Sequence, residues 1–178
     1  MLPLAGLREK SWRWVVLFAF LTAGGCGYQL QGKGTSSDPA IQMVAIPIFG
    51  NRTAQTGIES EVSRALVEKF TSSQRIAVGS QGTADALLLG NVKSFTTSSV
   101  AVTSGTQITT GYRAALTVEV TFQRRGDGKV LWKEEITEWR NYPVVPDLAV
   151  TENNKREAIR KISERLAERI QEIILGSF

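Results

Sequence analysis

The chain has 178 residues, of which 21 are Lys or Arg and 17 are Asp or Glu, so its formal net charge is only +4. A charge balance this mild argues against nucleic-acid binding, which needs a dense basic surface. The sequence contains no His and a single Cys, which excludes intrachain disulfides, thiolate zinc sites and imidazole bases, and no metal or cofactor is expected.

Residues 1–25 have the order of a secretory signal peptide. Arg8, Lys10 and Arg13 give a basic start, an apolar run follows over residues 14–21, and small residues come last. The apolar run is much shorter than the roughly 20 residues that span a bilayer. We therefore expect a cleaved signal here rather than a transmembrane helix.

The single cysteine, Cys26, stands directly after the small residues. This arrangement resembles the bacterial lipobox, in which the cysteine is acylated and becomes the first residue of the mature protein, although Ala23 stands where a lipobox usually has Leu. We expect Cys26 to be the lipid attachment site; the alternative is an ordinary signal peptide followed by a free thiol. Residues 26–40 are rich in Gly, Ser, Thr and Gln, which indicates a lipidated tether.

The folded part is predicted to be a single α+β domain over residues 41–178. Its first strand covers residues 41–49, in which Pro47 favours the edge of a sheet or the end of a strand. Residues 50–53 should then turn the chain. A brief strand is expected over residues 75–78.

A first helix is predicted between these two segments. Thr56 and Glu59 fit a capping box, in which a hydroxyl and a carboxylate satisfy free amides at the helix start. The helix should end near Ser72 and cover a sheet, because its apolar residues recur at four-residue spacing. These residues are Ile58, Val62, Leu66 and Phe70.

The next strand starts at residues 86–89 and leads into an unusual segment. More than half of residues 94–110 are Ser or Thr, and none is charged. Apolar and hydroxyl side chains alternate there, and β-branched residues suit a pleated surface. An extended hairpin with its tip at Ser104 and Gly105 is therefore predicted.

Residues 112–125 show the clearest alternation in the chain, which predicts a half-buried antiparallel strand. Residues 126–128, Gly-Asp-Gly, should supply the positive backbone dihedrals of a tight hairpin. Residues 130–142 then return beside the first strand. The residues predicted to face the core are Leu116, Val118, Val120 and Phe122.

The last helix should be capped by Asn153 or Asn154 and ended by Gly176. Its predicted buried stripe consists of Ile159, Ile162, Leu166, Ile170 and Ile173. The predicted fold is thus α+β, with two helices packed on a mainly antiparallel sheet of about four strands in the order β-α-β-β-β-α.

Several short motifs together point to one family. They are Cys26-Gly27-Tyr28-Gln29-Leu30, Ile46-Pro47-Ile48-Phe49, Asn51 with Thr53, Gly57-Ile58-Glu59, Ala84-Asp85-Ala86 and Gly128-Lys129-Val130-Leu131-Trp132. In their order and spacing the chain resembles the LptE family of lipopolysaccharide-assembly lipoproteins. The resemblance covers nearly all of the mature chain.

The resemblance implies an outer-membrane lipoprotein, palmitoylated and facing the periplasm. Such a protein plugs the barrel of a partner, LptD, assists its assembly and contacts lipopolysaccharide during insertion into the outer leaflet. Gly27 fits this location, because lipoproteins kept at the inner membrane often carry Asp after the cysteine. No catalysis is implied.

The residues themselves offer candidates for both contacts. A hydroxyl-rich surface can exchange hydrogen bonds with a polar barrel lumen without burying an unpaired charge. The partner-contact candidates are Ser98, Ser99, Thr103, Ser104, Thr106 and Thr109. Lipopolysaccharide carries phosphates and carboxylates, which favour Lys and Arg. The candidates for that contact, each of which is otherwise a solvated surface cation, are Arg113, Arg124, Arg125, Lys129 and Lys133.

Two other functions stay open. A periplasmic lipoprotein with a similar opening could activate a cell-wall synthase or form a secretion-channel subunit, although a channel needs two amphipathic hairpins of bilayer length and only residues 94–121 come close. A glycan-cleaving enzyme would need paired carboxylates. Glu134 and Glu135 point to opposite faces of a strand, and the sequence does not place Asp85 near Glu119.

Overall fold

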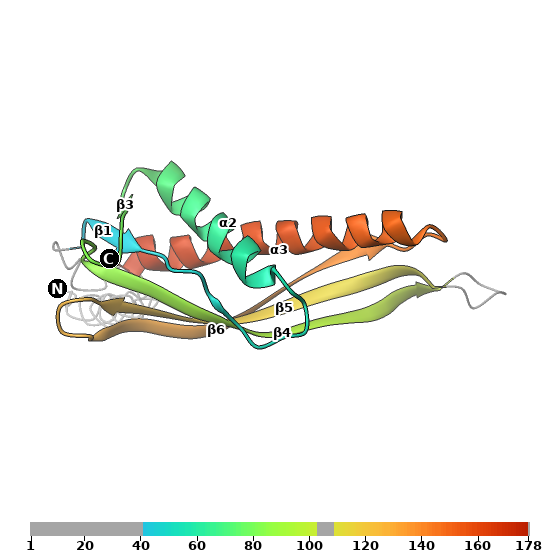
Figure 1. Cartoon of the computed structure of the whole chain (residues 1–178), viewed down its shortest axis with the longest axis horizontal. Coiled ribbons are helices and arrows are strands. Elements are labelled where there is room, and N and C mark those ends of the chain that lie inside the picture. The colour runs from blue at the N-terminus through green and yellow to red at the C-terminus, as the bar shows by residue number, and fades with distance from the viewer. Residues whose placement is uncertain (1–40, 103–108, 178) are drawn as a thin grey trace, which may run out of the picture. The chain divides into compact units, whose positions relative to one another are not determined.

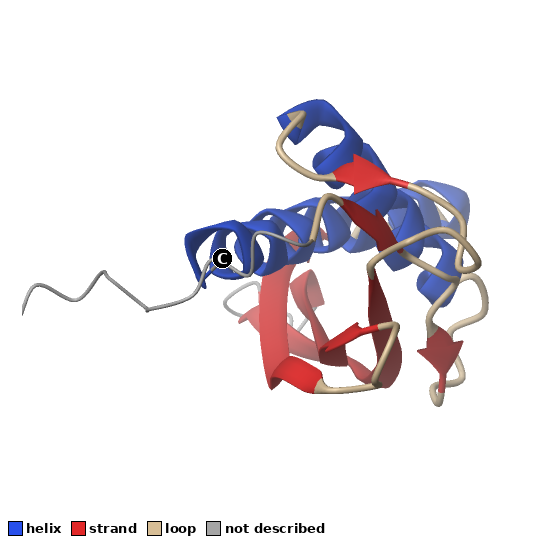
Figure 2. Cartoon of the chain, turned by 90° about the vertical axis from the view of Figure 1, so that its left-hand side faces the viewer, coloured by secondary structure: helices blue, strands red, loops and turns tan. Residues whose placement is uncertain are grey.

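The computed structural model describes residues 41–102 and 109–177, which form six strands and two helices. The strands make one mixed sheet, and the two helices lie together on one side of it (Figure 1; Figure 2). The predicted α+β class is confirmed, although the sheet has more strands than expected. The elements are β1 (Met43–Ala45), β2 (Gly50–Asn51), α2 (Ile58–Ser73), β3 (Ala77–Val78), β4 (Ala86–Val102), β5 (Thr109–Arg124), β6 (Val130–Pro143) and α3 (Leu148–Ser177).

Three long antiparallel strands form the main part of the sheet. β4 pairs with β5 and β5 pairs with β6 over most of their lengths. The strand order is β3-β1-β4-β5-β6, and β2 also pairs with β4. The short strands β1, β2 and β3 pair in parallel with their neighbours, so the sheet is mixed rather than purely antiparallel.

The strand predicted over residues 41–49 is divided into two. β1 ends at Ala45, and residues 50–51, predicted to be a turn, form β2 beside Asn91 and Val92 of β4. Pro47 lies between the two pieces and has no N–H to donate to a neighbouring strand. Phe49 holds the second piece in place: its ring lies so close to Gly90 that a Cβ there would be 2.2 Å from it.

Helix α2 starts without the predicted capping box. Its N-cap is Gly57, with a left-handed φ of 84° and no side-chain cap. The Glu59 carboxylate instead accepts a hydrogen bond of 2.7 Å from Nδ2 of Asn51. The carboxylate that the capping box needs is therefore bonded to another side chain. The predicted apolar stripe is buried as expected.

Helix α3 begins before the predicted caps. Oδ1 of Asp147 accepts hydrogen bonds from the amides of Ala149 at 2.8 Å and Val150 at 3.3 Å, and Nδ2 of Asn154 donates to the carbonyl of Pro143. Asp147 is therefore the N-cap, and Asn153 and Asn154 lie inside the helix. The predicted stop at Gly176 is also wrong, because the helix runs to Ser177.

The hairpin between β5 and β6 needs fewer left-handed residues than predicted. Of its two glycines only Gly128 has a positive φ, of 69°. The Gly128 amide donates to the Arg124 carbonyl at 3.0 Å, and the Arg124 amide donates to the Lys129 carbonyl at 2.9 Å. One left-handed residue is enough because the turn closes on these two bonds.

The core lies between the helices and one face of the sheet. All four β5 residues predicted to face the core are fully buried, and each such side chain stabilises the fold by about 1.5–3 kcal/mol. Most of the predicted α3 stripe is buried as well, but Ile174 rather than Ile173 occupies the last fully buried position. Helix α3 packs against α2 and β6.

We predict that Asp147→Ala lowers the free energy of unfolding by about 1 kcal/mol, because the first amides of α3 lose their acceptor. The matched control is Asn153→Ala, since the exposed Asn153 side chain makes no hydrogen bond within the described residues. Urea unfolding followed by circular dichroism measures both variants. An equal loss in the control would show that Asp147 does not cap the helix.

Candidate functional site

The side chains of β4, β5 and β6 that point away from the helices form a continuous surface, which we call the open face. Period-2 alternation places hydroxyl groups next to one another on it. Thr117 lies opposite Thr137, and their hydroxyls share a hydrogen bond of 2.9 Å. On the other side, Ser94 lies opposite Thr117 and Thr96 lies opposite Ala115. The open face therefore offers many small, neutral hydrogen-bonding groups.

The carboxylates of the open face are each matched by a lysine. Glu119 and Glu135 lie opposite one another on neighbouring strands. Lys133 approaches Glu119 at 3.2 Å, and Lys93 approaches Glu135 at 2.7 Å. The hydrogen bond to Glu135 raises the pKa of Lys93 above its ordinary value. The centre of the open face is thus close to neutral.

Arg113 and Trp139 contact each other on the open face, near the β4–β5 connection. The guanidinium lies 4.2 Å from the centroid of the Trp139 ring, and its Nε donates to Oδ1 of Asn141 at 3.2 Å. Trp139 is nevertheless 55% exposed. A cation held over an exposed indole combines a charged and an apolar contact group in one place.

The cations predicted to bind lipopolysaccharide fall into separate places. Arg113 and Lys133 share the open face, but Lys133 lies eight residues along β6 from the partner of Arg113, roughly 26 Å away. The other three lie at the β5–β6 hairpin. There Arg124 pairs with Asp127 at 2.9 Å, Nε of Arg125 donates to the carbonyl of Ala84, and Lys129 is exposed.

The predicted partner-contact residues are only partly covered by the structure. Ser98 and Ser99 are exposed on β4, opposite Arg113 and Tyr112. Thr109 begins β5, but its side chain is outside the described part. Cys26, Thr103, Ser104 and Thr106 lie outside the described residues altogether.

Sequence reasoning missed a groove beside β4, of about 480 Å³, which we call the edge groove. It lies on the helix side of the sheet near the β4–β5 connection, and the start of α3 lines it with Leu148, Thr151, Glu152 and Lys155. The rings of Tyr112 and Tyr142 are 6.0 Å apart within it. Burial raises the pKa of Tyr142, and the Glu152 carboxylate adds to the effect. The signal in the sequence was the position of these two tyrosines, which lie near the ends of the two strands predicted from alternation.

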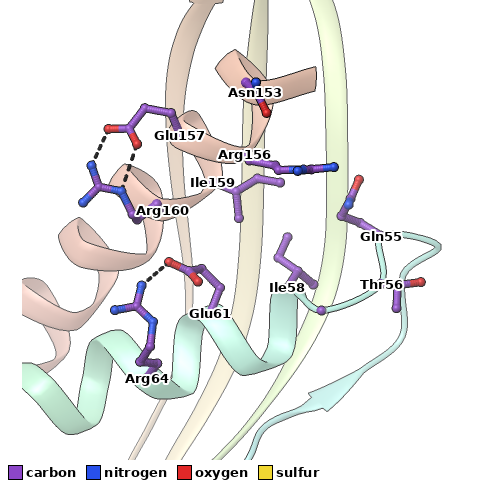
Figure 3. Close-up of a pocket in the computed structure, with 11 residues that line it drawn as sticks. Gln55, Thr56, Ile58, Glu61, Arg64, Asn153, Arg156, Glu157, Ile159 and Arg160 are labelled. Carbon is purple, nitrogen blue, oxygen red and sulfur yellow. Dashed lines mark hydrogen bonds and ion pairs between the residues drawn. The ribbon is translucent and has the colours of Figure 1, made fainter. Parts of the chain in front are cut away.

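A smaller pocket, of about 360 Å³, lies between the start of α2 and the first half of α3 (Figure 3). Ile58 and Ile159 line it, and the guanidinium of Arg156 extends toward Gln55. Arg160 is paired with Glu157 at 2.9 Å, whereas Arg156 makes no ion pair within the described residues. The pocket offers a solvated cation but no buried polar group that would hold a ligand.

In the described part of the chain, three of the carboxylates that the sequence raised for a catalytic pair are bonded to other groups. Glu119 and Glu135 each face a lysine, and Asp85 accepts hydrogen bonds from the amides of Gln42 and Met43. Within residues 41–102 and 109–177, no three His, Cys, Asp or Glu residues are grouped to hold a metal. Neither described helix is long and apolar enough to cross a membrane.

Comparison with known proteins gives one family and several shared folds. The lipopolysaccharide-assembly family LptE matches residues 41–172. Rare lipoprotein B from Shewanella oneidensis superposes with a TM-score of 0.53 at 16% identity, over 72% of this chain and 94% of that one. A protein from Xanthomonas campestris superposes with a TM-score of 0.50 at 15% identity, over 71% of this chain and 81% of that one. No curated protein matches the sequence.

The raised pKa of Tyr142 predicts a loss of stability at high pH. Its folded pKa exceeds the ordinary value of 10.0, so the unfolded chain releases this proton first. The resulting stabilisation is complete below about pH 10 and is lost as the pH rises through the folded pKa. Tyr142→Phe should flatten this part of the profile in urea unfolding, whereas Tyr112→Phe, which keeps the Tyr142 hydroxyl, should retain it. Identical alkaline profiles for Tyr142→Phe and the unchanged protein would contradict the assignment.

Proposed function

The chain belongs to the LptE family of lipopolysaccharide-assembly proteins, and we propose that it is an outer-membrane lipoprotein that plugs an LptD-like barrel and assists its assembly. In this proposal the signal peptide is removed before Cys26, and the acylated cysteine holds the protein on the periplasmic side of the membrane. The described residues then form the part that enters the partner. Contact with lipopolysaccharide follows from that position.

The open face is the observation that supports barrel contact. Its hydroxyl groups can exchange hydrogen bonds with a polar lumen, and its Lys–Glu pairs avoid the cost of burying single charges. The lumen of a barrel is polar because its strands turn their apolar side chains to the lipid. Ser98, which lies opposite Arg113, belongs to this surface, whereas Ser99 lies opposite Tyr112 on the helix side of the sheet.

Lipopolysaccharide contact would use cations outside the paired centre. Arg113 is the strongest candidate, because its partners are a neutral amide and an indole rather than a carboxylate. Its guanidinium keeps its charge available to a phosphate, and Trp139 offers an apolar surface beside it. Arg124, Arg125 and Lys129 would act as a second group at the β5–β6 hairpin, whereas Lys133 is paired with Glu119 in the centre of the open face and is the weaker candidate.

The same proposal assigns no catalytic role to this chain. The family is not an enzyme family, and the carboxylates that an enzyme would need are held by lysines or by backbone amides. The identity of the bound partner distinguishes this proposal from the alternative of a cell-wall synthase activator or a secretion-channel subunit. Purification through the acylated chain should recover an outer-membrane barrel rather than a synthase.

Replacing the chain by a Cys26→Ser variant in depleted cells should lower both barrel assembly and surface lipopolysaccharide, because the protein loses its membrane anchor. Membrane fractionation should find the variant in the soluble fraction, and mass spectrometry should find acyl chains only on the unchanged protein. The unchanged chain, supplied in the same way, is the control. Normal barrel assembly and surface lipopolysaccharide after depletion would refute the function, and an unmodified thiol in the unchanged protein would refute the anchor.

Ser98→Lys should reduce the barrel protein that co-purifies with the chain by about tenfold or more, equivalent to about 1.4 kcal/mol, because contact would then bury an unpaired charge. Thr71→Lys places the same charge on an exposed position of α2 and should leave recovery unchanged. Both variants should keep the unfolding midpoint of the unchanged protein. Equal recovery of the barrel with both would remove Ser98 from the contact surface.

A further inference from the structure

Within residues 41–102 and 109–177, part of β4 has no partner strand on one side. The carbonyl of Val92 accepts a hydrogen bond of 3.0 Å from the Arg52 amide, next to the last residue of β2. Beyond Val92, no strand in the described ranges pairs with β4 on this side. Residues 94–98 therefore form a free edge of the sheet, which we call the β4 edge.

The backbone groups that face outward along the β4 edge can be assigned from the pairing. Val92 turns its carbonyl to β2, so Val92 and its partner Val118 do not exchange hydrogen bonds. The same alternation along β5 turns Leu116 and Ala114 away from β4. After the bulge at Lys93 their partners are Phe95 and Thr97, which consequently present their N–H and C=O groups to the free side.

The two long edges of the sheet differ in how they are protected. β6 forms the opposite edge and carries many charged side chains, a common defence against unwanted strand pairing. Helix α3 also packs against β6. Residues 94–98 carry no charge and no proline. The charged residues of β6 are Lys133, Glu134, Glu135, Glu138 and Arg140.

The edge groove runs directly beside the β4 edge. Phe95 and Thr97, whose backbones face the free side, also line the groove with their side chains. Tyr112, Tyr142 and Val144 line it further in. A strand lying along β4 would turn every second side chain toward this groove and the others toward the open face. Backbone groups and a groove for alternate side chains are the two parts of a strand-addition site.

We propose that the β4 edge accepts an extended, uncharged segment of the barrel partner as an additional strand, with alternate apolar side chains in the edge groove. The identity of the partner rests on the proposed function; the mode of binding comes from the edge and the groove. A lipid acyl chain does not suit the site, because it cannot pair with the outward N–H and C=O groups. The two charged residues that line the groove, Glu152 and Lys155, pair with each other at 2.7 Å, so a charge on the incoming segment would be desolvated there without a partner.

The first test removes one outward N–H. Thr97→Pro deletes the Thr97 amide on the free side, where proline is tolerated in an edge strand, and Thr97→Val is the matched control that keeps this amide. With the full chain co-expressed with the barrel protein, Thr97→Pro should weaken the complex by about tenfold or more, and Thr97→Val should not. Circular dichroism and the unfolding midpoint check that both variants fold. Equal complex formation by the two folded variants would overturn strand addition.

The second test uses the unchanged protein and does not depend on whether a variant folds. Hydrogen exchange of the peptides covering residues 94–98 should slow by about tenfold or more when the free chain enters the complex. A complex that forms with unchanged exchange here overturns strand addition but leaves the proposed function intact. Absence of any complex overturns both. Protection that appears in the free chain as its concentration rises identifies a second copy as the occupant, and this also overturns the proposal.

Discussion

Burial of one face of the β4–β5–β6 sheet under α2 and α3 is the interaction on which the rest of the structure depends. Leu116, Val118, Val120 and Phe122 are completely enclosed there. Because successive side chains of a strand point to opposite faces, their burial also fixes which residues form the open face. A slip of one residue in β5 would bury Glu119 without its lysine and expose the whole apolar set. The core and the surface chemistry are therefore set by one register.

The helices do not cover the whole sheet, and this leaves part of β4 accessible. Helix α3 packs against β6 and α2, while β2 leaves β4 after Val92. Beyond that point the helix side of β4 borders a groove, and no strand of the described part of the chain pairs with its edge. The open face, the edge groove and the β4 edge thus meet near the same end of the sheet.

The open face has a charge-balanced part and a part with an available positive charge. The centre of the open face is balanced by its Lys–Glu pairs, so it can approach a polar wall without leaving a charge unpaired. Arg113 is held by an amide and an indole and keeps its charge available. The sheet thus carries a charge-balanced, hydroxyl-rich surface and an available cation side by side.

The sequence alone determined the parts of the fold that depend on local periodicity. Alternation identified the buried face of β5, four-residue spacing identified the stripes of α2 and α3, and short motifs identified the family. The predicted capping residues were wrong at both helix starts, because another residue close in the sequence makes the hydrogen bonds there. Glu59 bonds to Asn51 instead of closing a capping box, and Asp147 caps α3 ahead of the two asparagines.

Only the tertiary structure decided how the strands pair and what they leave uncovered. The parallel pairing of β1 and β2 with β4 and the end of β2 depend on contacts between residues about 40 positions apart in the chain, and the bulge at Lys93 depends on contacts between residues about 25 apart. A free edge is defined by the strand that does not lie beside it, and no local pattern encodes that. The hydroxyl-rich segment was visible in the sequence; its place at the edge of the sheet was not, because pairing is a property of the whole fold.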